Sequence, residues 1–399
     1  MRKAAILAVA LAVSASVADA QGAFRSPSEA EVTSYARLMA MTDSRTLDRA
    51  LVDSALVSTW APLRAAAALA VGQVGVKHGR PGVGLLTELL NDSDVKVASN
   101  AAYALGLLHD SSSVGALSRA LDLRIAIARE AAWALGEIGA PARAAIVAGL
   151  RKPGADEGRM IQLLLAAAKL RPVPVAELRP YLAMTSKPSV QWAASYAIAR
   201  IRAPAGVRDL IALSSTPEMQ RSTPSAENAG TIAPYVVPTV ARQRARAEIA
   251  RALTKQAAGD SLGDAAIPVL LRLASDPHPH VRINAVRSLA TYGALGRDAV
   301  AAATSDADAN VRIAAAQSLG TVLDSTVAAW MPLWARDTSL MYRASLLSSA
   351  SHSGAYLPAL TEWMTNGDWH YRNAALNAIG ASTDKGRVAR AAYAMLADT

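Results

Sequence analysis

The chain reads V-R-I-N-A-V-R-S-L-A at Val281–Ala290 and V-R-I-A-A-A-Q-S-L-G at Val311–Gly320, so one ten-residue motif occurs twice at a spacing of 30 residues. Each copy follows an acidic turn, D-P-H-P-H at Asp276–His280 and D-A-D-A-N at Asp306–Asn310. A period of about 20–50 residues is typical of stacked repeats, in which one unit covers its apolar face only with its neighbours. The spacing therefore predicts a repeat array instead of a single globular core.

The same motif recurs along most of the chain, and we number its residues as motif positions 1 to 10. Further copies, three of them weak, lie at residues 63–72, 97–106, 127–136, 159–170, 190–199, 244–253, 341–350 and 371–380. Other apolar stretches of helical period separate the copies, for example at Val83–Leu90 and Ala265–Ala274. Each repeat unit is therefore predicted to be a pair of helices.

Helical geometry explains the motif. At about 100° per residue, positions 1, 5 and 9, which typically hold Val, Ala and Leu, fall within roughly 80° of one another. We expect this stripe to be buried, and we expect the small residue at position 10 to let neighbouring pairs stack closely. Asp94 and Asp308 stand just before their helices and are suited to capping them.

The composition favours helices throughout. The 399 residues include a single phenylalanine, Phe24, and no cysteine, and the formal charge is +9. Abundant alanine favours helices, whereas a sheet domain usually needs more aromatic and β-branched residues. The lack of cysteine excludes disulfides and cysteine-based zinc sites. The basic charge is compatible with anionic partners.

The motif V-R-x-x-A-A-x-A-L-G resembles the HEAT-repeat family, in particular the short bacterial HEAT-like repeats first described in phycobilisome lyases. The resemblance covers nearly all of the chain after its N-terminal segment. It implies an all-α fold, an α-solenoid (α-α superhelix) of about ten helix pairs, with the motif helices on the concave side. It also implies that the arginines at position 2 pair with acidic residues of the adjacent turn; these are Arg64, Arg282, Arg312 and Arg372.

The N-terminal segment has the pattern of a secretory signal peptide. Arg2 and Lys3 precede the apolar run Ala4–Val13, and the segment ends in Ala18-Asp19-Ala20, a small-x-small cleavage site. The apolar run is too short to span a bilayer. We therefore expect residues 1–20 to be removed after Ala20, and the protein to be periplasmic or secreted, with no nucleic-acid partner and no membrane span.

One segment interrupts the array. Residues 214–240 carry four prolines, Pro217, Pro224, Pro234 and Pro238, with Ser, Thr and Gly between them. Proline removes backbone donors and breaks helices. We expect a loop or linker at 214–240 between an N-terminal solenoid at 21–213 and a C-terminal solenoid at 241–399.

No catalytic motif stands out. The chain has no nucleophile elbow, no zinc-protease motif and no phosphate-binding loop. His278 and His280, near Asp276, are residue types that bind metals, but they occupy the turn that corresponds to Asp306–Asn310 in the next repeat. Since a metal site needs three or more converging ligands, we predict a turn there, and no metal, cofactor or catalytic residue.

Positions 3 and 7 lie opposite the buried stripe and are the candidates for binding. Their residues are Ser99 and Tyr103, Arg129 and Trp133, Trp192 and Tyr196, Ile283 and Arg287, Ile313 and Gln317, Asn373 and Asn377. Because Trp, Tyr and Arg are enriched in binding hot spots, we predict a protein- or peptide-binding groove. It is centred on Arg129, Trp133, Trp192 and Tyr196 and includes Tyr103 and Arg287. Alternatively, these rings pack against neighbouring repeats.

A second basic feature comprises Arg242, Arg244, Arg246 and Arg251. Arg242 and Arg246 share one helical face. This face is interpreted as solvated, with an anionic docking site as the alternative.

Three functions are compatible with these residues. The first is an exported scaffold that binds a protein or peptide of the cell envelope on its concave face and catalyses nothing itself. The second is the repeat part of a peptidylprolyl isomerase, because residues 337–347 and 368–375 resemble exported bacterial proteins that join HEAT repeats to a cyclophilin-type domain. In the cyclophilin family this domain is rich in phenylalanine. Because the only phenylalanine here is Phe24, we expect this chain not to contain such a domain. The third is a lyase-like or chaperone partner of a chromophore protein.

Overall fold

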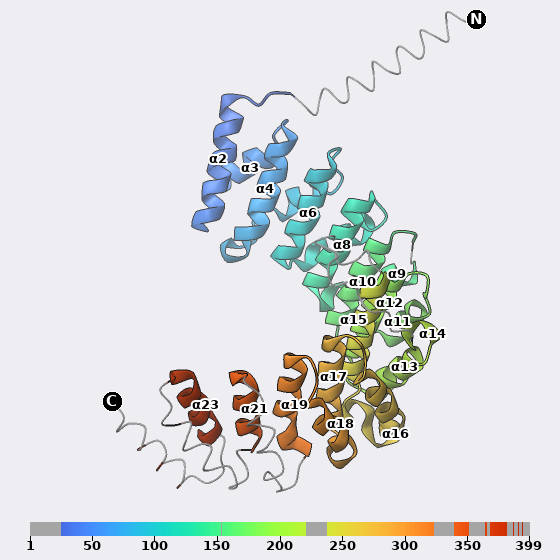
Figure 1. Ribbon diagram of the computed structural model, residues 1–399. Helices are drawn as coiled ribbons and strands as arrows, with labels where there is room; N and C mark the ends of the chain where they lie inside the picture. The colour runs from blue at the N-terminus through green and yellow to red at the C-terminus, as the bar shows by residue number, and fades with distance from the viewer. Residues whose placement is uncertain are drawn as a thin grey trace, which may run out of the picture. The chain divides into compact units, whose positions relative to one another are not determined.

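The computed structural model describes residues 25–152, 154–220, 238–322, 339–350, 364 and 368–380, together with the single positions 386, 390 and 393. Every regular element in this part of the chain is a helix, which confirms the prediction of an all-α solenoid (Figure 1). The chain divides into two compact units, Met1–Pro174 and Val175–Thr399.

In the first unit, the motif helices form one row and the intervening helices pack on it (Figure 1). The motif helices are α4 (Ala61–Val74), α6 (Val95–Leu108), α8 (Ile125–Ile138) and α10 (Glu157–Lys169). Between them lie α5 (Val83–Leu89), α7 (Val114–Ala120) and α9 (Arg143–Arg151), and α2 (Glu29–Ser44) and α3 (Arg49–Leu56) precede them. Each motif helix packs on the next, as the stacked-pair prediction requires.

The second unit repeats this arrangement. Its motif helices are α12 (Pro188–Ala199), α15 (Pro238–Ala252), α17 (Pro279–Ala290), α19 (Ala309–Val322), α21 (Leu340–Ala350) and α23 (Trp369–Gly380). Packed with them are α11 (Val175–Leu182), α13 (Pro204–Ser214), α14 (Pro217–Gln220), α16 (Lys255–Leu273) and α18 (Arg297–Ala303).

The buried stripe and the helix caps follow the motif. In α6, Val97, Ala101 and Leu105 at positions 1, 5 and 9 are all fully buried. Burial of a valine or leucine side chain such as Val97 or Leu105 stabilises the fold by about 1.5–3 kcal/mol. The Asp94 carboxylate accepts hydrogen bonds from the backbone N–H groups of residues 96 and 97 at 2.8 and 3.1 Å, and Asp308 caps α19 in the same way. Both predictions are confirmed.

Position 10 sets the distance between repeats. A Cβ atom added to Gly106 would lie 2.8 Å from the Cα of Ala134, and one added to Gly136 would lie 2.9 Å from the Cα of Ala166. Such distances are too short for a real Cβ, so these glycines let successive motif helices touch backbone to backbone. The predicted role of the small residue is confirmed at both positions.

The predicted boundary at 214–240 does not coincide with the division between the compact units, which falls between Pro174 and Val175. Within the second unit α12 packs on α15 and α13 packs on α16, so the array continues past this segment. Ser214, Pro217–Gln220 and Pro238–Val240 belong to helices. Residues 221–237 lie outside the described part, and the loop or linker there stays a prediction.

Candidate functional site

The six predicted binding residues divide equally between the two units. Tyr103, Arg129 and Trp133 belong to the first unit, and Trp192, Tyr196 and Arg287 belong to the second. Each unit brings two aromatic side chains together, in different ways. A single groove centred on both sets stays a prediction, as does the concave placement of the motif helices.

Tyr103 and Trp133 stack on each other between two successive repeats. Their ring centroids lie 4.6 Å apart with planes inclined by 21°, and both side chains are partly buried. The Trp133 ring also covers Gly106, since a Cβ added there would lie 2.7 Å from its Cζ3. This pair therefore packs α8 on α6, as the alternative interpretation of the aromatic residues predicted.

Arg129 is bound to the start of the next motif helix. Its Nε and Nη2 donate to the two carboxylate oxygens of Asp156 at 2.9 and 2.6 Å, and that carboxylate also caps α10 by accepting from the Arg159 N–H at 2.7 Å. The hydrogen bonds from Arg129 lower the pKa of Asp156, and the same pairing raises the pKa of Arg129. The guanidinium of Arg129 thus joins two repeats.

Trp192 and Tyr196 lie one helical turn apart on α12, with centroids 6.3 Å apart and planes inclined by 43°. A guanidinium lies over each ring at 5.5 Å from its centroid: Arg244 of α15 over Trp192, and Arg200 over Tyr196. Both rings are partly buried and Arg200 is exposed. We call these two adjacent rings and the guanidinium over each of them the cationic–aromatic row, which lies at the surface of the second unit.

The sequence analysis assigned neither flanking arginine to this site: it did not single out Arg200, and it named Arg244 only as part of the basic set on residues 242–251. Arg200 follows Tyr196 by four residues, so helical spacing alone could have found it. Arg244 comes from the next motif helix, and only the packing of α15 on α12 brings it to Trp192.

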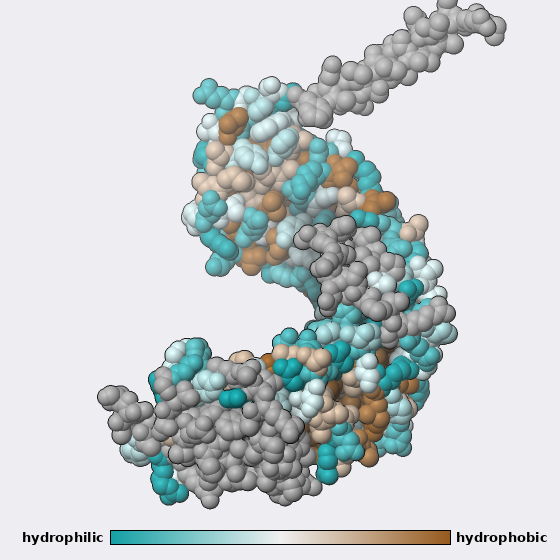
Figure 2. Space-filling view, in the orientation of Figure 1, coloured by the Kyte–Doolittle hydropathy of each residue, from teal (hydrophilic) through white to brown (hydrophobic). Residues whose placement is uncertain are grey.

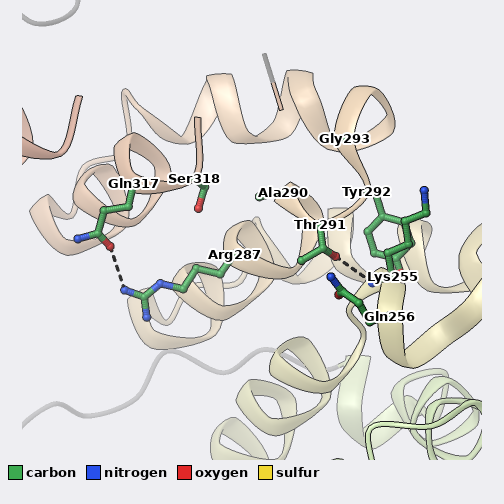
Figure 3. Close-up of a pocket in the computed structure, with 9 residues that line it drawn as sticks. All are labelled: Lys255, Gln256, Arg287, Ala290, Thr291, Tyr292, Gly293, Gln317 and Ser318. Atoms are coloured by element: carbon green, nitrogen blue, oxygen red, sulfur yellow. Dashed lines mark hydrogen bonds between the residues drawn. The ribbon is translucent and has the colours of Figure 1, made fainter. Parts of the chain in front are cut away.

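Arg287 lies on α17 and is exposed. Its Nη2 donates to the side-chain oxygen of Gln317 on α19 at 3.3 Å, so position 7 of one repeat contacts position 7 of the next. The same two residues line a pocket of about 460 Å³ in the second unit (Figure 3).

The predicted arginine–aspartate pairing at position 2 is observed. Arg64 donates to both oxygens of Asp92 at 2.8 and 2.9 Å, and Arg282 donates to both oxygens of Asp306 at 2.8 and 2.7 Å. Arg312 donates to two backbone carbonyls of its own turn, as Arg282 also does. The ion pairs of Arg64 and Arg282 join neighbouring repeats.

The interpretation of Arg246 as part of a solvated face, or of an anionic docking site, is wrong. Arg246 pairs with Asp276 at 2.6 Å, and their side chains are only 4% and 2% exposed. The motif copy is one residue later than we placed it, at 245–254, which puts Arg246 at position 2. Because that copy ends in Thr254 and not in glycine, its register was ambiguous in the sequence. Arg251, in the same set, pairs with Glu248.

The turn before α17 has the structure predicted for it. Asp276 accepts from the His278 backbone N–H at 2.9 Å, and Gln243 Nε2 lies 2.6 Å from His278 Nδ1. Within the described ranges, no three His, Asp or Glu side chains come close enough together to hold a metal ion. No helix in those ranges is long and apolar enough to cross a membrane.

Hydrophobicity alone marks no binding surface among the described residues that face the viewer in Figure 2. On the face drawn in Figure 2, apolar side chains of the described residues occur in small groups separated by hydrophilic ones. Scattered exposed apolar residues are normal on protein surfaces. The cationic–aromatic row on α12 and the pocket at Arg287 are therefore the more informative features.

Comparison with known sequences finds one repeat family in two stretches of the chain. Residues 83–168 and 241–320 match the sequence profile of HEAT repeats, and these ranges hold motif helices of both units. These two stretches of the chain are thus similar to HEAT repeats, in agreement with the sequence resemblance. No curated protein matches it.

Solved structures with a similar arrangement share little sequence with it. An engineered protein is 16% identical, with 89% of this chain and 96% of that chain covered and a TM-score of 0.42. Kap121p is 12% identical, with coverages of 90% and 44% and a TM-score of 0.44. Kap95p, in a structure with RanGDP, is 14% identical, with coverages of 83% and 45% and a TM-score of 0.45. The chain spans less than half of each of the last two proteins.

Proposed function

We propose that this protein is an exported HEAT-repeat scaffold that binds a protein or peptide of the cell envelope through the outward faces of its motif helices. It has no catalytic activity of its own. The repeat fold supports the scaffold role, because stacked helix pairs present extended surfaces for partners. The signal-peptide pattern of residues 1–20, which lie outside the described part, supports export.

The observation that carries this proposal is the row on α12, where Trp192 and Tyr196 stand side by side with a guanidinium over each ring. Trp, Tyr and Arg dominate binding hot spots, because they bury large areas and keep a polar or charged group for hydrogen bonding. Partly buried rings are also held in place before a partner arrives, which reduces the entropy cost of binding.

Quantitative affinity capture from cell-envelope extract tests the proposal. The wild-type protein is compared with Trp192→Ala and with the control Tyr35→Ala, which removes an exposed aromatic residue of α2 outside positions 3 and 7. We expect a partner retained by the wild type and by Tyr35→Ala to be lost with Trp192→Ala. If a folded Trp192→Ala protein, checked by circular dichroism, retains every partner, the proposed surface is wrong.

Two further measurements address export and catalysis. N-terminal sequencing of the mature protein from the periplasm or medium should begin at Gln21, and an intact Met1 would contradict export with cleavage.

A prolyl-isomerase assay on the full chain should show no turnover. Measurable turnover would overturn the scaffold proposal in favour of the isomerase alternative.

A further inference from the structure

The pocket at Arg287 is formed entirely within the second unit. Its walls are the C-terminal end of α17, the first residues of α16 and the outward face of α19, and its volume is about 460 Å³. Pockets of about 300–1,000 Å³ are typical of sites for small ligands or for one or two side chains. This pocket is therefore large enough for a short stretch of peptide.

Hydrogen bonds fix the pocket wall. Thr291 Oγ1 accepts from the Lys255 backbone N–H at 2.8 Å and donates to the Ser288 carbonyl at 2.6 Å. The buried Tyr292 donates its hydroxyl hydrogen to the Leu253 carbonyl at 2.9 Å, and burial raises the pKa of Tyr292 to about 12. Because these bonds tie the start of α16 to the end of α17, the pocket exists before a ligand enters.

The two cationic side chains lie at opposite ends of the pocket. Figure 3 shows Arg287 with Gln317 at one end and Lys255 with Tyr292 at the other, and Gln256 and Thr291 between them. The ligand that matches this layout is extended and carries negative charge at two points.

The charge of these two residues is not neutralised within the described part of the chain. No acidic side chain lines the pocket there, and neither Lys255 nor Arg287 forms an ion pair with a described residue. By contrast, Arg251 at the same motif position pairs with Glu248, and Arg282 pairs with Asp306. The partner of Arg287 is a neutral amide oxygen at 3.3 Å, a weaker acceptor than a carboxylate.

We propose that this pocket binds an acidic segment of the peptide partner, with one carboxylate at Arg287 and another at Lys255. Gln256 and Gln317 offer both donors and acceptors, which suit the N–H and C=O groups of a peptide backbone. A nucleic-acid strand fits less well, because it needs a track of cations along its phosphates. The inference rests on the proposed peptide-binding function and names the chemistry of that partner.

Isothermal titration calorimetry on the full-length protein tests the proposal with two capped hexapeptides, one of glutamate and one of glutamine. Arg287→Gln and Lys255→Gln each remove one pocket cation. Arg208→Gln, in the exposed face of α13, is the matched control for loss of charge. A single-stranded oligonucleotide of matched charge is titrated in parallel.

We expect the glutamate peptide to bind at least about tenfold more tightly than the glutamine peptide, and each pocket variant to weaken it about fivefold. The control should bind as the wild type does, and added salt should weaken binding. The proposal is overturned if both pocket variants bind the glutamate peptide as well as the wild type, if the glutamine peptide binds equally tightly, or if the oligonucleotide binds better.

The Trp192→Ala protein separates this inference from the proposed function. If it loses the envelope partner while Arg287→Gln and Lys255→Gln retain it, the scaffold function stands and the pocket inference fails. If the pocket variants lose the glutamate peptide while Trp192→Ala retains every partner, the pocket stands and the proposed surface on α12 fails.

Discussion

Tyr103 and Trp133 stack between two repeats in the first unit, whereas Trp192 and Tyr196 lie side by side on one helix in the second. Tyr103, Trp133 and Tyr196 all occupy position 7, so the motif position does not decide the role of the ring. The difference lies in its neighbour. Trp133 meets a ring and a glycine of the preceding repeat, while Tyr196 meets a tryptophan of its own helix and an exposed arginine.

The arginines of the two units differ in the same way. Arg129 pairs with Asp156 while its side chain stays 49% exposed, whereas Arg246 pairs with Asp276 at 4% exposure. One pair is solvated and the other is enclosed between repeats. The comparison teaches that identical chemical groups stabilise the array or remain available to a partner according to how the next repeat covers them.

The largest expected effect separates the two ion pairs. Arg246→Ala leaves the buried Asp276 carboxylate without its partner and should lower the free energy of unfolding by about 3–5 kcal/mol. Arg129→Ala breaks a solvent-exposed pair and should cost less than about 1 kcal/mol. Urea unfolding followed by circular dichroism measures both. Equal losses would show that the difference in burial does not matter.

The second largest effect should be a difference in stability between the alanine variants of the two tryptophans. Trp133→Ala removes a ring that packs on Tyr103 and Gly106 and should cost about 2–3 kcal/mol, below the range for a fully buried ring because Trp133 is only partly buried. Trp192→Ala removes the ring contact with Tyr196 and the cation–π contact with Arg244, so it should cost roughly 1 kcal/mol, and its main effect should be on partner binding. The same unfolding experiment measures the stabilities. A larger loss for Trp192 than for Trp133 would reverse the comparison.

The glycine under Trp133 provides a sharper test of the stacked pair. Gly106→Ala places a methyl group 2.7 Å from the Trp133 ring and 2.8 Å from the Ala134 Cα, so overpacking should cost about 1–3 kcal/mol. The control Gly115→Ala on α7 meets only the Arg119 guanidinium at 3.8 Å and should be neutral or stabilising by up to about 1 kcal/mol. Thermal unfolding of both variants decides. If Gly106→Ala is as stable as the control, the repeats are not in close contact there.

The smallest expected effect concerns Glu130, which occupies motif position 4 on α8. Asn100 and Asn284 at this position donate to a backbone carbonyl of the preceding repeat at 2.9 and 3.2 Å, which a carboxylate cannot do. Burial raises the pKa of Glu130, and the charge of Lys96 partly offsets this. When the pKa of a carboxyl group is higher in the folded than in the unfolded protein, the group contributes stability at pH values below its unfolded pKa. That stability is lost as the pH rises through the pKa of the folded protein.

Glu130→Gln should therefore stabilise the protein at pH 7 by less than about 1 kcal/mol. The gain should disappear below about pH 4, where the glutamate is protonated in both folded and unfolded states. Unfolding midpoints measured across this range test the sign. A gain that is constant with pH would show that the ionisation of Glu130 is not its cause.

The repeats were predictable where the motif is complete. In the copies that end in Gly106, Gly136 and Gly320, the terminal glycine fixes the register of the motif. The register in turn predicted the buried stripe, the caps at Asp94 and Asp308 and the pairing of Arg282. Arg246 was misplaced because its copy has no terminal glycine, and a shift of one residue turns a helical side chain by about 100°. The pocket could not be found, because its walls come from α16, α17 and α19 together.

By itself, the sequence determined that this protein is a helical repeat array and, where the motif is complete, which face of the motif helix is buried, because both depend on the local period of apolar and small residues. Only the tertiary structure decided which exposed-face residues are taken up by packing. Whether a ring or a guanidinium meets a glycine, an aspartate or open solvent depends on how closely the next repeat approaches. That approach is set by contacts between residues about 30 positions apart, which the helical period does not encode.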